Sequence, residues 1–258
     1  MGLTCSGPGA IAPTAPALTS QDTRRLELAV RQARAAASTC ASALLPGSAA
    51  SADLGALVRE HCDFAHQAVL LFPTTCDAAV RWFDESGYAP SAPVPSVVVA
   101  GRVGARHGVA PRRCGIRVGR LHVAAGDTTI PGVEVFLFPR ASPAWSPEIA
   151  YQERRFGFEN HTALRVRSPD DDLLRALMTA LCRDAGLVWE GGGFNPREGA
   201  TGSSVLYFVG GGASPQGRER FERWEVCCPG DFETFIARHP VDRDAVSRAY
   251  RDAAPKRA

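Results

Sequence analysis

Hydrophobic and polar positions change their period along the chain, and these changes divide the sequence into six segments. Residues 1–20 are rich in Gly, Pro, Ala, Ser and Thr and follow no period, so we expect a disordered tail there. Residues 21–61 carry apolar positions at helical spacing, and this predicts an arm of two helices, the second over 52–61. We interpret the arm as a packing or dimerisation element.

Residues 62–140 and 158–230 follow the same order of elements. In the first half an alternating strand over 66–72 is followed by a helix, and three more strands are expected at 94–101, 114–124 and 133–138. The second half repeats this order with a strand over 161–166, a helix over 170–186 and strands at 187–191, 203–210 and 223–228. Residues 141–157 are interpreted as a linker and residues 231–258 as a C-terminal helix and tail. The pattern predicts an α+β fold of two βαβββ modules.

Four residues with ligand chemistry occupy corresponding positions in the two halves. His66 and His161 begin the first strand of each half, and Glu134 and Glu225 lie on the last strand. A glutamate inside an apolar strand is costly to bury unless it is paired or binds a cation. Imidazole and carboxylate together suit a divalent transition metal, so the sequence predicts a metal site formed by these four residues. Pairing with arginine is the rival explanation, with these candidate partners: Arg140, Arg165 and Arg223.

The alternation of side chains along a strand suggests what surrounds this site. Phe136 shares a face with Glu134, and Arg165 and Arg167 share a face with His161. We expect the two arginines to bind a substrate carboxylate or phosphate and Phe136 to line the site. Tyr207 in the second half is a further candidate for substrate contact, alongside a role in the core.

Composition and charge exclude some classes of partner. The chain has 258 residues, 45% of them hydrophobic, and a net charge of +2 without a run of basic residues, which argues against nucleic acid. No apolar run is long enough to cross a membrane and no signal peptide is evident, so we expect a cytoplasmic protein. The eight cysteines follow no regular spacing, which favours reduced thiols. The adjacent Cys227 and Cys228 are interpreted as strand packing.

Three segments resemble the vicinal oxygen chelate superfamily, which includes glyoxalase I. They are VEVFLFPR around Glu134, GFENHTALRV around His161 and AVRWFDESGY in the first helix, and the resemblance spans about residues 64–230. It implies a curled mixed sheet that forms a cup and holds one divalent metal ion, which would be Fe, Mn, Ni, Co or Zn. The expected ligands are His66, Glu134, His161 and Glu225.

The same resemblance implies the chemistry. A small oxygenated metabolite would undergo isomerase, epimerase or lyase chemistry through a metal-stabilised enediolate or oxyanion, with Glu134 or Glu225 as the base. The chain departs from glyoxalase I in its helical arm and in the arginine-containing segment 101–113, so methylglyoxal detoxification is not the expected activity.

Two alternatives stay open at this point. A 2-His-1-carboxylate set of His66, His161 and Glu225 resembles the Fe(II) dioxygenases of the same superfamily. Glu134 decides between the two enzymes, because a fourth protein ligand leaves less room for substrate and O₂. A metal-free protein that sequesters a drug or another small molecule is the third hypothesis, and such a protein would contain no stoichiometric metal.

Overall fold

The computed structural model describes residues 16–45, 51–125, 128–196, 200–213 and 219–253. The first half contains β1 (Cys62–Leu71), β2 (Ala89–Pro90), β3 (Val94–Pro95), β4 (Arg117–Ala125) and β5 (Thr128–Leu137). The second half contains β6 (His161–Val166), β7 (Val188–Asn195), β8 (Ser203–Ala213) and β9 (Glu219–Pro229). Within the described residues these strands form one mixed sheet in the order β2-β4-β5-β1-β6-β9-β8-β7, and β3 also pairs with β4.

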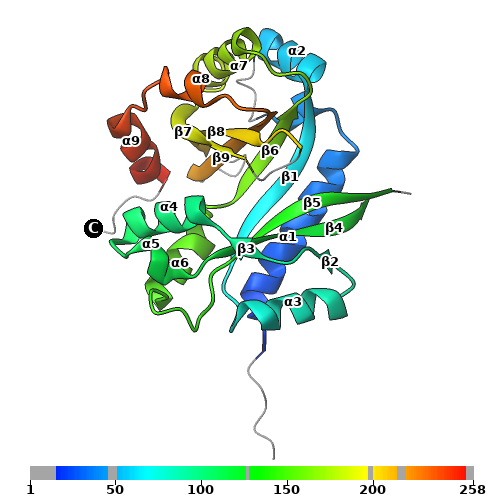
Figure 1. Cartoon of the computed structure of the whole chain (residues 1–258), viewed down its shortest axis with the longest axis vertical. Helices are drawn as coiled ribbons and strands as arrows, with labels where there is room; N and C mark the ends of the chain where they lie inside the picture. Colours follow the sequence, from blue (N-terminus) through cyan, green and yellow to red (C-terminus); the bar gives the residue numbers. More distant parts are fainter. Residues whose placement is uncertain (1–15, 46–50, 126–127, 197–199, 214–218, 254–258) are drawn as a thin grey trace, which may run out of the picture.

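Both halves pair their strands in the same way. In each half the first strand runs parallel to the last, β1 with β5 and β6 with β9, and the last strand runs antiparallel to the one before it. The halves join edge to edge through the antiparallel pair of β1 and β6, which lies at the centre of the molecule (Figure 1). This repeat confirms the predicted α+β fold of two modules in one mixed sheet.

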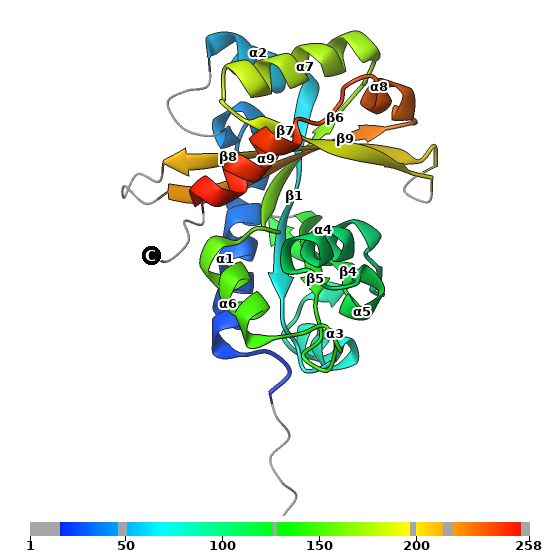
Figure 2. The same ribbon diagram turned by 90° about the vertical axis from the view of Figure 1, so that its left-hand side faces the viewer.

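Helices cover both faces of the sheet. On the second half, α2 (Ala52–His61) and α7 (Asp171–Arg183) lie over one face, and α9 (Arg243–Ala253) crosses the other (Figure 2). The short α8 (Glu233–Ala237) and the 3₁₀ helix η1 (Ala41–Leu44) lie on the same side as α2 and α7, where they contribute to one hydrophobic cluster. This cluster includes Leu54, Val58, Leu174, Leu177 and Trp224.

The first half has an apolar core on each face. On one face α1 (Ser20–Ala37) and α3 (Cys76–Glu85) pack on side chains such as Val69 and Val135. On the other face the sheet residues Leu70 and Phe138 contact α4 (Val97–His107), α5 (Pro111–Cys114) and α6 (Pro147–Phe156). These three helices therefore occupy part of the face on which His66 and Glu134 also lie.

The prediction of a strand over residues 94–101 is wrong. Only Val94 and Pro95 pair with β4, and the chain then forms the helix α4. Its buried positions Val99, Ala100, Val103 and Gly104 recur at helical spacing, and the helix ends at Gly108 with a φ of 66°. The β-branched valines favour a strand locally, but packing of this helical face on the sheet outweighs that preference.

The predicted linker 141–157 contains a helix, α6. Ser146 caps it by accepting a hydrogen bond from the backbone N–H of Ile149, and Pro147 occupies its first turn, where proline favours a helix start. At the N-terminus, residues 1–15 of the predicted tail lie outside the described residues, but Leu18 is buried and Thr19 caps α1. Of the described helices, none combines the length and the hydrophobicity that crossing a bilayer requires.

Candidate metal centre

The four predicted ligands come from the four central strands of the sheet. His66 lies on β1, Glu134 on β5, His161 at the start of β6 and Glu225 on β9. Glu134 is in register with Ala68 on β1, while Ala163 on β6 pairs with His66 on one side and Glu225 on the other. Because alternate residues of a strand share a face, these registers place all four side chains on the same face, across the junction of the halves.

The functional atoms of the four residues lie close together. His66 Nε2 is 3.8 Å from Glu134 Oε2 and 3.8 Å from Glu225 Oε1, and His161 Nε2 is 3.2 Å from Glu225 Oε2. The centroids of the two imidazole rings are 5.5 Å apart. Glu134 has the most exposed of the four side chains, at 13%. The structure thus brings two imidazoles and two carboxylates from both halves into one buried group.

The two imidazoles present nitrogen atoms that nothing in the described chain satisfies. His161 Nδ1 lies 3.1 Å from the backbone oxygen of Glu159, and because a carbonyl oxygen only accepts, Nδ1 carries the proton. The other ring nitrogen of His161, Nε2, faces Glu225 Oε2 at 3.2 Å. His66 Nε2 and His161 Nε2 are both buried and have no hydrogen-bond partner among the described residues. Such orphaned nitrogens beside carboxylates fit the donor set of a divalent cation.

Burial sets the ionisation of this group. It lowers the pKa of His66 to about 3, with help from His161, Arg120 and Arg165 and against the opposing effect of Glu225. The neutral imidazole, which is the form that binds metals, is thus the stable form at neutral pH. Burial disfavours the Glu225 carboxylate, but its contacts with His161, His66 and Cys227 outweigh this and keep its pKa below the usual range.

The predicted substrate-binding residues fall into two groups. Phe136 and Tyr207 lie beside the centre, with ring centroids 6.0 Å and 6.4 Å from that of His161. Arg165 is exposed and follows Ala163 by two residues on β6, so it shares the face of the centre. Arg167 lies away from the centre, because its Nη1 donates to Asp63 Oδ1 at 2.6 Å at the start of β1.

Two of the arginines named as rival partners of the glutamates, Arg140 and Arg223, bind other groups. Arg223 donates to Glu190 and Glu159 rather than to Glu225, and Arg140 donates to the backbone oxygen of Pro16. Glu134 instead has Arg120, at 3.6 Å between Nε and Oε1, as its arginine neighbour. Arg120 pairs with Glu134 across β4 and β5, and no residue pattern in the sequence indicated this contact.

Two further residues lie beside the centre, and no role there was predicted for them from the sequence. Cys227 Sγ donates a hydrogen bond to Glu225 Oε1 at 2.9 Å, and the two-residue spacing of Glu225 and Cys227 on β9 puts both on one face. Arg102 on α4 lies over the Tyr207 ring at 4.6 Å and donates to Glu159. Because α4 was expected to be a strand, the sequence offered no signal for Arg102.

Glu159 anchors the loop that orients His161. Its side chain is fully buried and accepts hydrogen bonds from Arg102 at 2.9 Å, Arg106 at 2.6 Å and Arg223 at 3.1 Å. Burial opposes ionisation of this carboxyl, but the three guanidinium groups hold its pKa at about 2. The charged cluster fixes the backbone of Glu159, whose carbonyl oxygen in turn holds the Nδ1–H of His161.

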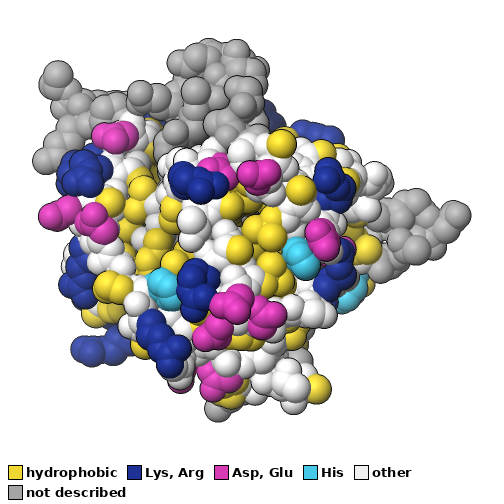
Figure 3. Space-filling model, turned by 90° about the horizontal axis from the view of Figure 1, so that it is seen from above, with side chains coloured by type: hydrophobic (Ala, Val, Ile, Leu, Met, Phe, Trp, Pro, Cys, Tyr) yellow, Lys and Arg dark blue, Asp and Glu magenta, His cyan; other side chains and the backbone are white. Residues whose placement is uncertain are grey.

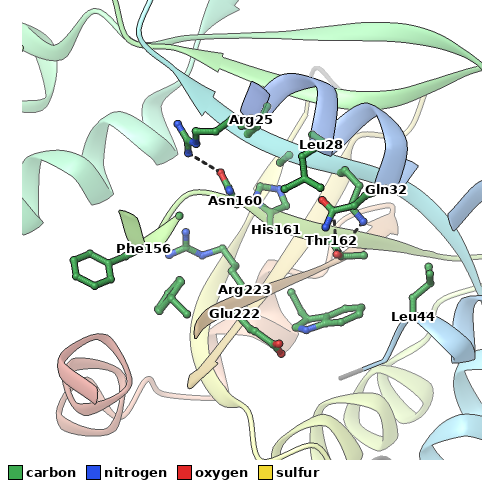
Figure 4. A pocket seen from close by; sticks show the side chains of 17 residues that line it. Arg25, Leu28, Gln32, Leu44, Phe156, Asn160, His161, Thr162, Glu222 and Arg223 are labelled. Atoms are coloured by element: carbon green, nitrogen blue, oxygen red, sulfur yellow. Dashed lines mark hydrogen bonds between the residues drawn. The ribbon is translucent and has the colours of Figure 1, made fainter. Parts of the chain in front are cut away.

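A cavity of about 230 Å³ lies on the α1 side of the junction. Arg25 and Gln32 of α1 face Asn160 and Thr162 across it, and His161 also borders it (Figure 4). Gln67 and Thr162 alternate with His66 and Ala163 along their strands, so they project to the face opposite the four candidate ligands.

On the surface seen from the end that carries α2 and α7, basic and acidic side chains are interspersed (Figure 3).

Comparisons with known proteins place the chain beside structures of low similarity. No family model matches the sequence, and no curated protein matches it. Methylmalonyl-CoA epimerase from Mycobacterium tuberculosis aligns with a TM-score of 0.31 and 17% identity over 66% of this chain and 90% of the epimerase. A glyoxalase I mutant from Zea mays aligns with a TM-score of 0.18 and 13% identity over 66% of this chain and 48% of the glyoxalase.

UcmS2 aligns with a TM-score of 0.18 and 15% identity over 61% of this chain and 94% of its own. At these scores the description of the fold rests on the strand order and pairing given above.

Proposed function

We propose that this protein is a divalent-metal-dependent enzyme that acts on a small oxygenated metabolite by proton transfer, as an isomerase, epimerase or lyase. One observation carries the proposal. The buried Nε2 atoms of His66 and His161, one from each half, lack hydrogen-bond partners in the described chain and face carboxylates at 3.2 to 3.8 Å. A purely structural cluster would leave two costly unsatisfied nitrogens, whereas a bound cation satisfies both.

His66, Glu134, His161 and Glu225 would hold the cation. When bound, a divalent ion supplies Lewis-acid stabilisation of the negative charge that develops on a substrate oxygen as a proton leaves the neighbouring carbon. The protein contributes the two imidazoles, the low-dielectric surroundings and the orientation of the carboxylates.

Glu134 is the better candidate for the base. The two oxygens of Glu225 already contact His161, His66 and Cys227, which fixes this carboxylate in place. Glu134 is more exposed, and within the centre it contacts His66 through one oxygen, Oε2, so its carboxylate is better placed to reach a substrate carbon. Arg165, on the same face, supplies positive charge for an anionic substrate group, and Phe136 and Tyr207 contribute aromatic walls.

Elemental analysis tests the metal site without a known substrate. The purified protein is stripped with a chelator, reloaded with one ion at a time and desalted, and the bound metal is measured per chain. We expect about one ion per chain. His161→Ala should lose it, whereas His122→Ala, which removes an exposed histidine on β4, should retain it. A wild-type protein without stoichiometric metal would instead favour the small-molecule-binding alternative.

A second candidate function rests on Arg120. Because this residue lies 3.6 Å from Glu134, it can hold that carboxylate away from the cation, which leaves His66, His161 and Glu225 as a 2-His-1-carboxylate set. Such a site favours an Fe(II) dioxygenase. Oxygen consumption by the Fe(II)-loaded protein with candidate phenolic and carbonyl substrates separates the two functions, because the proton-transfer enzyme consumes no O₂.

A further inference from the structure

Cys227 places a sulfur atom beside the predicted metal ligands. It follows Glu225 by two residues on β9, so both side chains project from the same face of the strand. Its Sγ donates to Glu225 Oε1 at 2.9 Å, and this sulfur, a Glu225 oxygen and a His66 nitrogen all lie within 4.8 Å of one another. The residue is 8% exposed, so this arrangement is inside the protein.

The neighbouring Cys228 shows what an ordinary core cysteine looks like in this strand. Its side chain projects to the opposite face, is fully buried and belongs to the hydrophobic cluster under α2 and α7. Burial raises the pKa of the Cys228 thiol, as expected for sulfur surrounded by hydrocarbon. Cys227 instead faces imidazole and carboxylate groups, an environment that suits a ligand better than a packing residue.

The orphaned His66 nitrogen gives independent support for a ligand in this space. His66 Nε2 is buried without a hydrogen-bond partner in the described residues, and it belongs to both candidate groups of donors. One group adds Glu134 and His161 to it, and the other adds Glu225 and Cys227. His66 is thus shared by a group of nitrogen and oxygen donors and by a group that adds sulfur.

We propose that Cys227 is a further ligand of the metal centre, which makes the donor set a mixture of nitrogen, oxygen and sulfur. This inference rests on the proposed function, because it requires the four-residue site to bind a cation. On binding, the thiol loses its proton to the solution and with it the hydrogen bond to Glu225 Oε1, so that both the thiolate and this carboxylate oxygen can bind the cation. Thiolate is a soft ligand that favours Zn(II) and Co(II) over the harder Mn(II), so Cys227 narrows the choice of ion.

The absorption spectrum of the Co(II)-loaded protein tests this inference directly. A thiolate bound to Co(II) gives an intense charge-transfer band in the near ultraviolet, whereas nitrogen and oxygen ligands give only the weaker visible bands. We expect the wild-type protein to show the charge-transfer band at one Co(II) per chain. This measurement needs no substrate and no variant.

Two adjacent variants assign the band to one residue. Cys227→Ala should lose the charge-transfer band while it keeps the visible bands, and Cys228→Ala, a matched loss of the next thiol, should keep both. The preference for Zn(II) over Mn(II), measured by competition, should fall about tenfold or more in Cys227→Ala alone. Circular dichroism checks that each variant is folded.

Each outcome has one meaning. Stoichiometric Co(II) without a charge-transfer band in the wild type overturns the role of Cys227 and leaves the proposed function standing. A band that persists in Cys227→Ala also overturns it. If the wild-type protein binds no stoichiometric ion at all, the proposed function fails and this inference fails with it.

Discussion

At the residue scale, the two glutamates of the centre differ in the neighbours that they contact. Glu225 contacts both histidines and Cys227, whereas Glu134 contacts His66 on one side and Arg120 on the other. Glu225 is therefore fixed by three neighbours from within the centre. Glu134 lies between the centre and the guanidinium group of Arg120, and its role decides whether a bound metal would have three or four protein ligands.

Replacing the Glu134 carboxylate by an amide separates the two enzyme hypotheses. Loss of a residue that only orients a metal ligand weakens metal binding by roughly 10- to 100-fold. If Glu134 is itself a ligand, Glu134→Gln should weaken metal binding by at least this much. Titration against a chelator of known affinity measures the change. An unchanged affinity would assign Glu134 to Arg120 and favour the three-ligand site. Arg120→Gln is the companion variant, and it should weaken binding less than Glu134→Gln.

Glu153 on α6 predicts a pH dependence of stability away from the metal ligands. Burial raises the pKa of its carboxyl to about 7, against the opposing charge of Arg25, although Glu153 accepts a hydrogen bond from the backbone N–H of Glu159. Because the folded state binds the proton more tightly than the unfolded state, this group contributes stability below about pH 4.5 that is lost as the pH rises to about 7.

Glu153→Gln should remove this dependence. The amide oxygen can still accept from the Glu159 N–H, so relative to wild type the variant should gain on the order of 3 kcal/mol of unfolding free energy between about pH 5 and about pH 8. Urea unfolding at both pH values measures the difference. Glu148→Gln, on the exposed face of the same helix, is the control. A difference between Glu153→Gln and wild type that is the same at both pH values would contradict the prediction.

The sequence carried enough information to predict that the four candidate ligands come together, because their matched positions in the two halves and the period-two alternation of side chains are both retained in the sheet. His66 and His161 lie on paired strands, and the two glutamates flank them as the parallel pairing requires. Arg120 and Arg102 could not be found in this way. Each acts through a contact between elements that are distant in the sequence, and such contacts follow no local pattern.

At the element scale, α4 shows where local preference and packing disagree. Three successive valines, Val97 to Val99, favour a strand, and the structure instead forms a helix that fills part of the face beside the metal centre. The second half was easier to predict, because its helix α7 carries strongly periodic apolar residues and an Asp170 cap. A short run of β-branched residues therefore does not by itself predict a strand when a helix can bury the same side chains.

Two glycines of α4 provide a matched test of that packing. A Cβ at Gly104 would lie 2.7 Å from the backbone oxygen of Val109, whereas a Cβ at Gly101 meets nothing within 4 Å. Gly104→Ala should lower the unfolding free energy by about 1 to 3 kcal/mol through overpacking. Gly101→Ala should raise it by about 0.5 to 1 kcal/mol, because alanine favours the helix. Thermal or urea unfolding that moves both variants in the same direction would argue against this helix.

At the scale of the whole molecule, a helix that precedes the first half packs on the second half, and this contact ties the two halves together. The helix α2 precedes the first strand of the first half, yet its Leu54 and Val58 lie in the hydrophobic core of the second half. The start of β1 explains this route, because Cys62 pairs with Val166 of β6 and brings α2 over the second-half sheet. A ligand set drawn from both halves requires that they do not open independently.

Leu54→Ala tests this coupling. The side chain is fully buried, so its truncation should cost about 2 to 5 kcal/mol. If the molecule unfolds as one unit, hydrogen exchange should accelerate by the same free energy in peptides from β5 of the first half and from β8 of the second. Leu28→Ala, which truncates a side chain that is 42% exposed on α1, should change either region little. Acceleration confined to β8 would mean that the halves unfold separately, and the candidate metal ligands would then lie at a hinge instead of within a single rigid sheet.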